Sequence, residues 1–248
     1  MSGILTQILR AKANRPGYSG PDRSDLPRRS LLAALQPTQE LAVIAEFKRR
    51  SPSGGDLQVG RDAVATAMAY QAAGAAALSV LTEPDFFSGS PSDLVNVRQA
   101  SRLPVLRKDF LTDEADVWES RAMGADAILL IVRVVGERLG RLLEKTQEAG
   151  LEALVEVHDA PEVMAALAAG AQLIGINNRD LDTLQTDVSV SARLVPLVAE
   201  QAVVVSESGL QSRSQCLQLH ALGVDAFLIG EALLRGGTDA IFGQAVRP

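Results

Sequence analysis

Cysteine and histidine are almost absent from the 248-residue sequence, which contains only Cys216, His158 and His220. A lone cysteine excludes a disulfide framework and a cysteine zinc site within one chain, so we expect Cys216 to fill core space on a late helix. A metal site would need a shell made mostly of carboxylates, and the sequence has no clustered carboxylate motif. We therefore expect no metal ion.

Long apolar runs and an excess of positive charge are missing too. No stretch of about 18 consecutive apolar residues occurs, and residues 1–16 lack the basic start and cleavage site of a signal peptide. We therefore expect a cytoplasmic protein with no membrane partner. The formal net charge of −6 argues against a nucleic-acid partner, which would require a basic face. An anionic small molecule can still bind wherever positive charge gathers locally.

The chain length and the pattern of apolar residues favour one α/β barrel. A chain of 248 residues falls within the range of roughly 200–250 residues in which such a barrel is one domain. From residue 41 onward, short β-branched or apolar runs alternate with segments of helical periodicity, which is typical of repeated βα units. Eight strands are expected, and a closed (β/α)8 TIM barrel is favoured over an open sheet. The strands are expected at 41–47, 76–81, 104–110, 127–132, 153–157, 173–177, 203–206 and 226–230.

A weak internal repeat supports the barrel. A glycine and a small residue precede four of the expected strands, at Gly74, Gly124, Gly170 and Gly223. Glycine suits the left-handed position that ends a helix just before a short loop to the next strand. Residues 1–40 lie outside the eight units, and two apolar stripes in them predict one or two helices around a polar loop.

Polar side chains occur late in several of the expected strands. Side chains alternate between the barrel interior and the helix layer, and active sites of parallel barrels form at the carboxyl ends of the strands. This alternation directs five polar residues into the mouth, although each alone could be the solvated start of a loop. They are Glu46, Lys48, Lys108, Glu156 and Asn177.

Lysine is scarce in this chain, which has arginine at most of its basic positions. Only four lysines occur, and two of them, Lys48 and Lys108, lie at strand ends. Burial and neighbouring charges can make the proton of a lysine transferable, whereas a guanidinium stays charged. Both lysines are therefore candidates for acid–base chemistry. Asn177, on an otherwise apolar strand, is a candidate hydrogen-bonding residue or a buried structural asparagine.

Two glycine-containing loops follow the seventh and eighth expected strands. In barrels these loops commonly bind phosphate through backbone N–H groups. Gly209 and Gly230 let the backbone approach a ligand closely, and Ser208 adds a hydroxyl. We expect the carboxylates of Glu207 and Glu231 to point away from the phosphate. His158, two residues after Glu156, is interpreted as a loop residue.

Seven segments in barrel order resemble indole-3-glycerol phosphate synthase, and the resemblance covers residues 41 to about 235. The segments are AEFKRRSPSGG (45–55), LSVLTEPDFFSGS (78–90), VLRKDF (105–110), LVEVHD (154–159), IGINNRDL (174–181), SESG (206–209) and LIGEAL (228–233).

The resemblance implies a carboxy-lyase of tryptophan biosynthesis that uses no cofactor. Its substrate is 1-(2-carboxyphenylamino)-1-deoxyribulose 5-phosphate, an anionic sugar phosphate, and ring closure with loss of carbon dioxide and water gives indole-3-glycerol phosphate. Residues 1–248 then form a single domain in which residues 1–40 are a helical extension over the barrel mouth. We expect a monomer or a weak homodimer.

The family's functional positions fall on residues already noted. The general acid that protonates the substrate ketone corresponds to Lys108, and the lysine that pairs with the substrate carboxylate corresponds to Lys48. The remaining catalytic positions correspond to Glu46, Glu156, Asn177 and Ser208. Phe87 and Phe110 match aromatics that flank the anthranilate ring. Other substrate-binding positions correspond to Ser51, Arg179, Leu181, Gly209, Gly230 and Glu231.

Two other functions are weighed against this one. A sibling barrel such as phosphoribosylanthranilate isomerase is expected to use a cysteine and an aspartate as its acid–base pair, but the only cysteine here lies on an expected helix. A phosphate-ligand binding barrel without catalysis would show damaged catalytic positions, and the sequence shows none.

Overall fold

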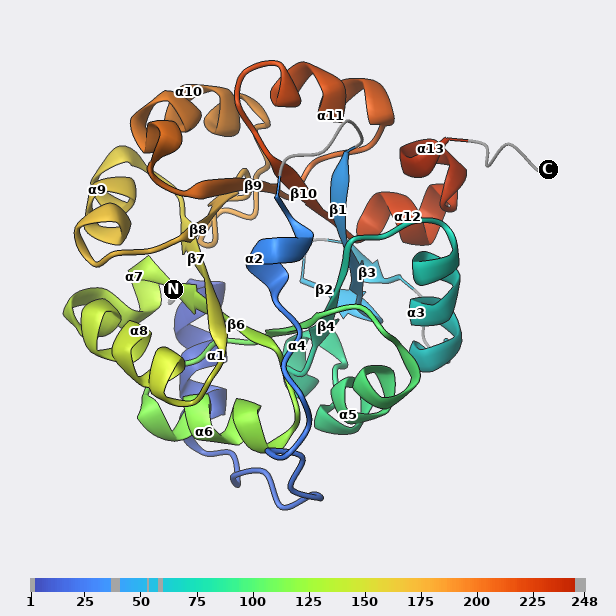
Figure 1. Cartoon of the computed structure of the whole chain (residues 1–248), viewed down its shortest axis with the longest axis vertical. Coiled ribbons are helices and arrows are strands. Elements are labelled where there is room, and N and C mark those ends of the chain that lie inside the picture. The colour runs from blue at the N-terminus through green and yellow to red at the C-terminus, as the bar shows by residue number, and fades with distance from the viewer. Residues whose placement is uncertain (1–2, 37–40, 53, 58–59, 244–248) are drawn as a thin grey trace.

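The structure is a computed structural model that describes residues 3–36, 41–52, 54–57 and 60–243. Eight parallel strands form a closed barrel in the order β1-β10-β9-β8-β7-β6-β5-β4 (Figure 1). This confirms the predicted TIM barrel and each of its eight strands. The bounds are β1 Ala42–Phe47, β4 Ala77–Leu81, β5 Val105–Lys108, β6 Ala127–Ile131, β7 Glu152–Val157, β8 Leu173–Asn177, β9 Val203–Glu207 and β10 Ala226–Ile229.

Helices surround the barrel and connect successive strands (Figure 1). The longer ones are α3 Ala63–Ala72, α5 Pro91–Ala100, α6 Glu114–Ala122, α8 Leu139–Glu148, α9 Ala160–Ala168, α10 Ser189–Val198, α11 Arg213–His220 and α12 Glu231–Gly236. Shorter helices are α4 Pro84–Phe87, α7 Val132–Val135, α13 Asp239–Phe242 and the 3-10 turns Gly136–Arg138 and Ala199–Gln201. A small hairpin of β2 (Arg50–Ser51) and β3 (Gly55–Asp56) follows β1. No helix in the described part of the chain is long and apolar enough to cross a membrane.

Side-chain alternation divides the core into two layers, as predicted. On β1, Val43, Ala45 and Phe47 pack in the cluster between strands and helices, whereas Ile44 packs in the separate cluster inside the barrel. Burial of apolar surface on both faces of the sheet stabilises the barrel at about 25 cal/mol per Å². The barrel interior is thus filled with side chains up to the strand ends, where the inward positions become polar.

The helix-to-strand junctions follow the predicted glycine pattern. Gly74, Gly124, Gly170 and Gly223 all have positive φ, between 82° and 103°, a backbone conformation that favours glycine. Cys216 is fully buried in α11, as expected.

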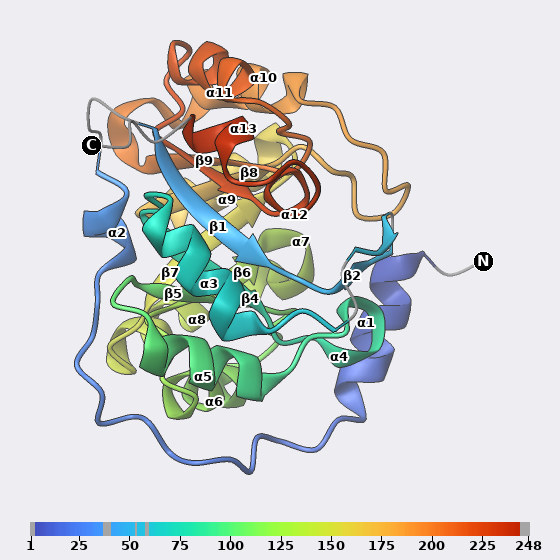
Figure 2. The ribbon, with the colours of Figure 1, turned by 90° about the vertical axis from the view of Figure 1, so that its right-hand side faces the viewer.

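The N-terminal segment reaches both ends of the barrel (Figure 2). Helix α1 (Ile4–Ala13) lies at the carboxyl ends of the strands, where Ile4, Leu5 and Ile8 line the mouth. Helix α2 (Leu31–Ala34) lies at the opposite end, and Leu31 and Leu35 complete the interior core there. The expectation that residues 1–40 extend over the mouth is therefore wrong for α2. Its apolar side chains instead cover the bottom of the barrel, because the exposed interior core at that end also needs a cover.

Candidate active site

A cavity of about 520 Å³ opens at the carboxyl ends of the strands, a size typical of small-molecule sites. Every residue expected to bind or act on substrate lines this cavity. These residues are Glu46, Lys48, Ser51, Phe87, Lys108, Phe110, Glu156, Asn177, Arg179, Leu181, Ser208, Gly209, Gly230 and Glu231. Two further carboxylates, those of Asp109 and Glu207, line it as well.

Lys108, the last residue of β5, is held between two carboxylates. Its Nζ lies 2.7 Å from Glu156 Oε2 on β7 and 2.7 Å from Glu207 Oε2 on β9. Both carboxylates are 1% exposed, so their attraction for the ammonium is weakly screened. An ammonium group has three N–H donors. In the described chain two of them have these protein partners, which leaves the third for a ligand in the cavity.

The three charges shift each other's protonation. Burial lowers the pKa of Lys108, but Glu156 and Glu207 outweigh that effect and raise it above the ordinary lysine value. Burial raises the pKa of Glu156, yet Lys108 and His158 bring it well below its usual range. Burial raises the pKa of Glu207 to about 7, because the pull of Lys108 is offset by repulsion from Glu156. Lys108 is therefore protonated at neutral pH, and Glu207 titrates there.

Glu207 is the site residue that the sequence prediction missed. Strand β9 runs to Glu207 rather than ending at Ser206, so Glu207 shares the inward face of Val203 and Val205. Its carboxylate passes over Gly175 of β8, where a Cβ would come within 2.1 Å of Glu207 Oε1. Glycine at 175 is therefore required for Glu207 to reach Lys108. The carboxylate turns into the barrel interior and toward Lys108.

A second lysine–carboxylate pair lies beside the first. Lys48 Nζ is 2.7 Å from Glu46 Oε1, and both side chains come from the carboxyl end of β1. Gly230 faces this pair, since a Cβ there would lie 2.7 Å from Glu46 Oε1 and 3.3 Å from Lys48 Nζ. Lys48 retains 17% side-chain exposure, so its ammonium is accessible from the cavity.

Asn177 connects the carboxylates to the loop after β8. Its Nδ2 donates to Glu156 Oε1 at 3.0 Å, and its Oδ1 accepts from the backbone N–H of Arg179 at 3.0 Å. The Arg179 guanidinium lines the cavity and donates to the carbonyl of Leu184 at 3.1 Å. Asn177 thus links the Glu156 carboxylate to the backbone of the loop after β8.

The loop after β9 adopts a left-handed backbone that suits anion binding. Ser208 and Gly209 have φ of 67° and 76°, and a Cβ at Gly209 would also clash with Thr186 Cγ2 at 2.5 Å. Asn178 holds this loop by donating to Ser206 Oγ and to the Ser208 carbonyl, each at 3.1 Å. Successive backbone N–H groups in such a turn form a concavity for anions.

Glu231 and Ser51 lie at the edges of the cavity. The Glu231 carboxylate accepts from Arg235 Nε at 2.9 Å, which neutralises a negative charge near the proposed anion site. Ser51 is buried in β2, and its Oγ accepts from the N–H of Gly54 at 3.0 Å. Ser51 therefore orders the turn between β2 and β3.

An apolar wall completes the mouth. The rings of Phe87 and Phe110 have centroids 6.1 Å apart and are tilted by 38°, a spacing typical of interacting aromatic pairs. Leu181 and the apolar face of α1 line the same cavity. An aromatic ligand can therefore bind beside the charged cluster.

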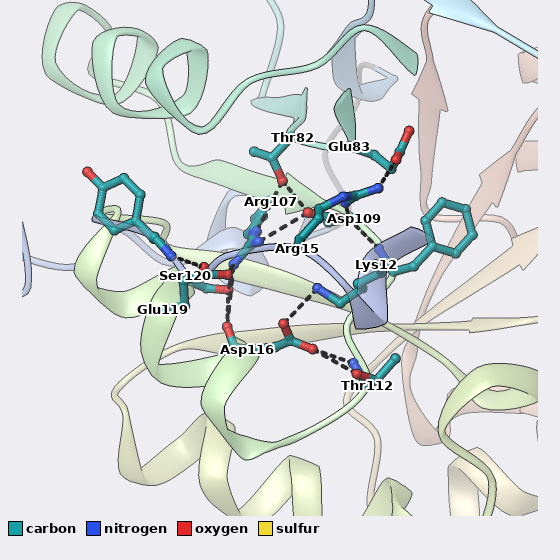
Figure 3. Close-up of polar contacts among 12 residues, drawn as sticks. Lys12, Arg15, Thr82, Glu83, Arg107, Asp109, Thr112, Asp116, Glu119 and Ser120 are labelled. Atoms are coloured by element: carbon teal, nitrogen blue, oxygen red, sulfur yellow. Dashed lines mark hydrogen bonds and ion pairs between the residues drawn. The ribbon is translucent and has the colours of Figure 1, made fainter. Parts of the chain in front are cut away.

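Ion pairs hold α1 and the residues just after it at the mouth of the barrel (Figure 3). Lys12 Nζ lies 2.6 Å from Asp116 Oδ1, and Arg15 pairs with Glu83 and, at 2.9 Å, with Asp85. Glu83 is fully buried, and its carboxylate also accepts from the backbone N–H of Phe87 at 3.0 Å. Arg15, just after α1, therefore links this helix to the turn that carries Phe87.

Replacing Arg15 by alanine is expected to raise KM for an aromatic substrate about tenfold with a smaller change in kcat. The change leaves Glu83 buried without its cation, and a hydrogen bond to a charged group contributes about 1.5–3 kcal/mol. Steady-state kinetics measures the effect. Arg10→Ala is the matched control, because Arg10 is an exposed arginine of α1, the helix that directly precedes Arg15. An unchanged KM in Arg15→Ala would show that α1 is held in other ways.

Within the described ranges, no group of three or more His, Cys, Asp or Glu side chains is arranged to hold a metal ion.

Comparison with known proteins gives consistent results over most of the chain. A family model described as indole-3-glycerol phosphate synthase matches residues 7–242. A Streptomyces coelicolor protein named indole-3-glycerol phosphate synthase 2 is 46% identical over 247 residues, covering 96% of this chain and 96% of that protein. The indole-3-glycerol phosphate synthase of Syntrophobacter fumaroxidans is 49% identical over 214 residues, covering 85% of this chain and 81% of that protein.

Solved structures resemble the fold at low sequence identity. An N-acetylmannosamine-6-phosphate 2-epimerase from Clostridium perfringens superposes with a TM-score of 0.63 at 15% identity, covering 85% of this chain and 93% of that one. This likeness concerns the barrel architecture alone, because folds of this kind host many unrelated activities.

Proposed function

Because the chain belongs to the indole-3-glycerol phosphate synthase family, we propose that its barrel mouth closes the indole ring of 1-(2-carboxyphenylamino)-1-deoxyribulose 5-phosphate. The products are indole-3-glycerol phosphate, carbon dioxide and water, and the reaction serves tryptophan biosynthesis. The observation that carries the proposal is the Lys108 ammonium, which lies 2.7 Å from both Glu156 and Glu207 at the wall of the cavity. A ketone needs such a proton donor to become an electrophile.

The cavity offers a separate place for each part of this substrate. The backbone N–H groups around Gly209 and Gly230 suit the phosphate, with Arg179 supplying positive charge. Phe87 and Phe110 suit one face of the anthranilate ring, because rings with centroids 6.1 Å apart are too close to hold another ring between them. Lys48 suits the substrate carboxylate, which would compete with Glu46 for its ammonium. This arrangement directs the substrate ketone toward Lys108.

Ring closure requires one proton at the ketone oxygen. The aromatic carbon that carries the carboxylate attacks the ketone carbon, and Lys108 gives a proton to the oxygen as it becomes a hydroxyl. The two carboxylates raise the pKa of Lys108. They therefore keep Lys108 protonated and do not make it a stronger acid. Proton transfer must therefore accompany carbon–carbon bond formation, when negative charge develops on the oxygen.

The later steps need a second acid and one base. Loss of carbon dioxide returns an electron pair to the ring. The new hydroxyl then takes a second proton from Lys48 and leaves as water. One C–H proton is lost to form the indole double bond. Glu207, with a pKa of about 7, is suited to take that proton at neutral pH.

The direct test of the function is product formation. Purified protein and 1-(2-carboxyphenylamino)-1-deoxyribulose 5-phosphate in buffer without added cofactor should yield indole absorbance and fluorescence. Absence of an indole product from the folded protein would reject the proposed reaction.

Replacing Arg179 by alanine is expected to raise KM roughly tenfold with little change in kcat, because the lost charge pairs with the phosphate in both the ground and transition states. Arg193→Ala, a change at an exposed arginine of α10, is the control. Inorganic phosphate should also inhibit the variant less strongly. A loss confined to kcat would contradict a phosphate-binding role.

The alternative isomerase chemistry receives no support from the site. Cys216, its candidate acid–base residue, lies on α11 and is buried in the core. We also propose that the protein acts in the cytoplasm as a monomer or weak homodimer, with neither nucleic acid nor membrane as partner. The net charge of −6 supports the last point.

A further inference from the structure

His158 lies immediately behind the catalytic carboxylates, at the first position after β7. Its side chain is 5% exposed, although the residue belongs to a loop. The ring stands between two carboxylates. Nε2 lies 3.4 Å from Glu156 Oε1, and Nδ1 lies 3.0 Å from Glu162 Oε2.

Glu162, in the first turn of α9, fixes the orientation of this ring. Its Oε2 also accepts from the backbone N–H of His158 at 2.8 Å, and its Oε1 pairs with Arg133 Nε at 3.2 Å. The side chain of Asp159 caps α9 by accepting from the N–H of Glu162 at 2.9 Å. Ring and backbone of His158 are thus held by the same carboxylate, which is itself held by a helix cap and an arginine of α7.

This geometry restricts where the protons can be. An ionised carboxylate only accepts hydrogen bonds, so the contact with Glu162 requires a proton on Nδ1. A neutral ring would then present the lone pair of Nε2 to Glu156. Two arrangements avoid that repulsion: an imidazolium facing the Glu156 carboxylate, or a neutral imidazole facing protonated Glu156. They differ by one proton moved between Nε2 and Glu156.

Nε2 is buried and forms no hydrogen bond to any described residue. It faces Glu156 Oε1, the oxygen that already accepts from Asn177 Nδ2, while Lys108 occupies Oε2. A shift of a few tenths of an ångström would bring Nε2 into hydrogen-bonding distance. In the resting site His158 is therefore within reach of Glu156 without being bound to it.

We propose that His158 is a positioning residue that passes one proton through Glu156 to Lys108 after Lys108 has protonated the substrate ketone, so that the Lys108 ammonium is restored between steps of the reaction. The Nε2–H bond breaks and leaves its electron pair on Nε2, an O–H bond forms on Glu156 and then breaks, and a new N–H bond forms on the neutral Lys108 amine. Nδ1–H stays hydrogen-bonded to Glu162 throughout, and the imidazole regains its proton from solvent. The inference deepens the proposed function and rests on it, because it assigns a proton partner to a carboxylate of that site.

The surrounding charges favour the imidazolium at rest. The charged groups around the ring are Glu156 of β7, Glu162 of α9, Arg133 of α7 behind Glu162, and Lys108 of β5 behind Glu156. Burial lowers the pKa of His158, but its contacts with Glu156 and Glu162 outweigh burial and raise it to about 9. The His158 ring is therefore an imidazolium at neutral pH and has a proton to give.

Histidine-ring NMR tests the proton arrangement in the resting enzyme. The chain has only two histidines, and His220→Gln identifies the His158 signals. We expect both ring nitrogens of His158 to carry protons at pH 7.5 and the ring to titrate near pH 9. Glu162→Gln should lower that midpoint while retaining an acceptor oxygen. A His158 ring that is neutral at pH 7.5, or that titrates below pH 7, would overturn the proposal.

Kinetics of His158→Gln test whether the exchange matters. His158 assists an acid–base residue rather than acting on substrate, so we expect kcat to fall about tenfold, below the 10²–10⁴ of a direct acid or base. KM should change less than about threefold. The wild-type kcat should fall as pH rises through about 9, where His158 loses the proton that it supplies, and this fall should be absent from His158→Gln.

Two controls separate this role from a structural one. His220→Gln, in α11, should leave kcat and the pH profile unchanged. A His158→Gln variant that has a lower kcat but keeps the fall through pH 9 would indicate a structural role and contradict the exchange. If the wild-type protein forms no indole product, the proposed function fails, whereas the NMR titration still tests the His158–Glu156 pair.

Discussion

Replacing Lys108 by alanine is expected to lower kcat by about 10²- to 10⁴-fold, the range of a general acid, while the substrate still binds. The variant loses the only ammonium placed between Glu156 and Glu207 in the described site. The phosphate and ring contacts lie on other strands and loops, so the Kd should change much less than kcat. Stopped-flow product formation and substrate binding by isothermal calorimetry measure the two quantities.

The fold should survive this change. Leaving a buried carboxylate without its partner costs about 3–5 kcal/mol when the charge persists. Glu207 already has a pKa near 7, so it can take up a proton and remove one of the two charges. Circular dichroism should therefore show a folded but less heat-stable protein.

Two variants control for the loss of a lysine and for charge. Lys145→Ala removes a lysine from α8 that pairs only with Glu148 among the described residues, and its kcat should match the wild type. Lys108→Arg keeps a positive charge but has no transferable proton, so it should be nearly as inactive as Lys108→Ala. Normal turnover in either folded Lys108 variant would rule out its role as the acid.

Replacing Glu207 by glutamine is expected to lower kcat about 100-fold or more and to remove a titration near pH 7. In the wild type, Glu207 has a raised pKa of about 7, so it is mostly a neutral acid below that pH and a carboxylate above it. Activity that depends on a base should therefore rise as pH increases through 7. Glutamine cannot ionise, and that rise should disappear.

The pH profile should be taken from kcat rather than kcat/KM, because a substrate phosphate has its own second pKa of about 6. Glu200→Gln, at an exposed glutamate in the turn after α10, is the matched control and should retain the rise. A Glu207→Gln variant that keeps both its turnover and the rise through pH 7 would remove Glu207 from the mechanism.

The sequence predicted most of this site because two simple periodicities govern a barrel. Side chains alternate along a strand, so Glu46, Lys108 and Glu156 could be directed inward without knowing any contact. All parallel strands of a barrel end at one rim, so residues from distant strands could be brought together. The scarcity of lysine supplied the chemical signal.

Glu207 was missed because the expected strand ended one residue too early. Extending the alternation of Val203 and Val205 by two residues points Glu207 inward, but its acidic side chain and the following SG turn looked like a loop. Expecting a phosphate there strengthened the error, since a carboxylate beside a phosphate is unfavourable. Glycine at 175, on the neighbouring strand, was the available sign that a long side chain crosses β8.

Contacts between segments that are far apart in the chain could not be predicted from the sequence. Arg15 pairs with Glu83 and Asp85 from a position nearly 70 residues earlier, and no periodicity specifies that pairing. The expected loop location of His158 was reasonable, but its burial depends on Glu162 folding back from α9. Tertiary packing, rather than local preference, determined both.

In the proposed reaction, one cavity binds the substrate with its ketone at Lys108. A crystal structure of Lys108→Ala with 1-(2-carboxyphenylamino)-1-deoxyribulose 5-phosphate tests it most directly. We expect the phosphate at the backbone of Gly209 and Gly230, the ring beside Phe87 and Phe110, and the ketone oxygen facing the space left by the Lys108 ammonium. A substrate bound in the reverse direction, with its phosphate at Lys48, or bound outside this cavity, would contradict the claim.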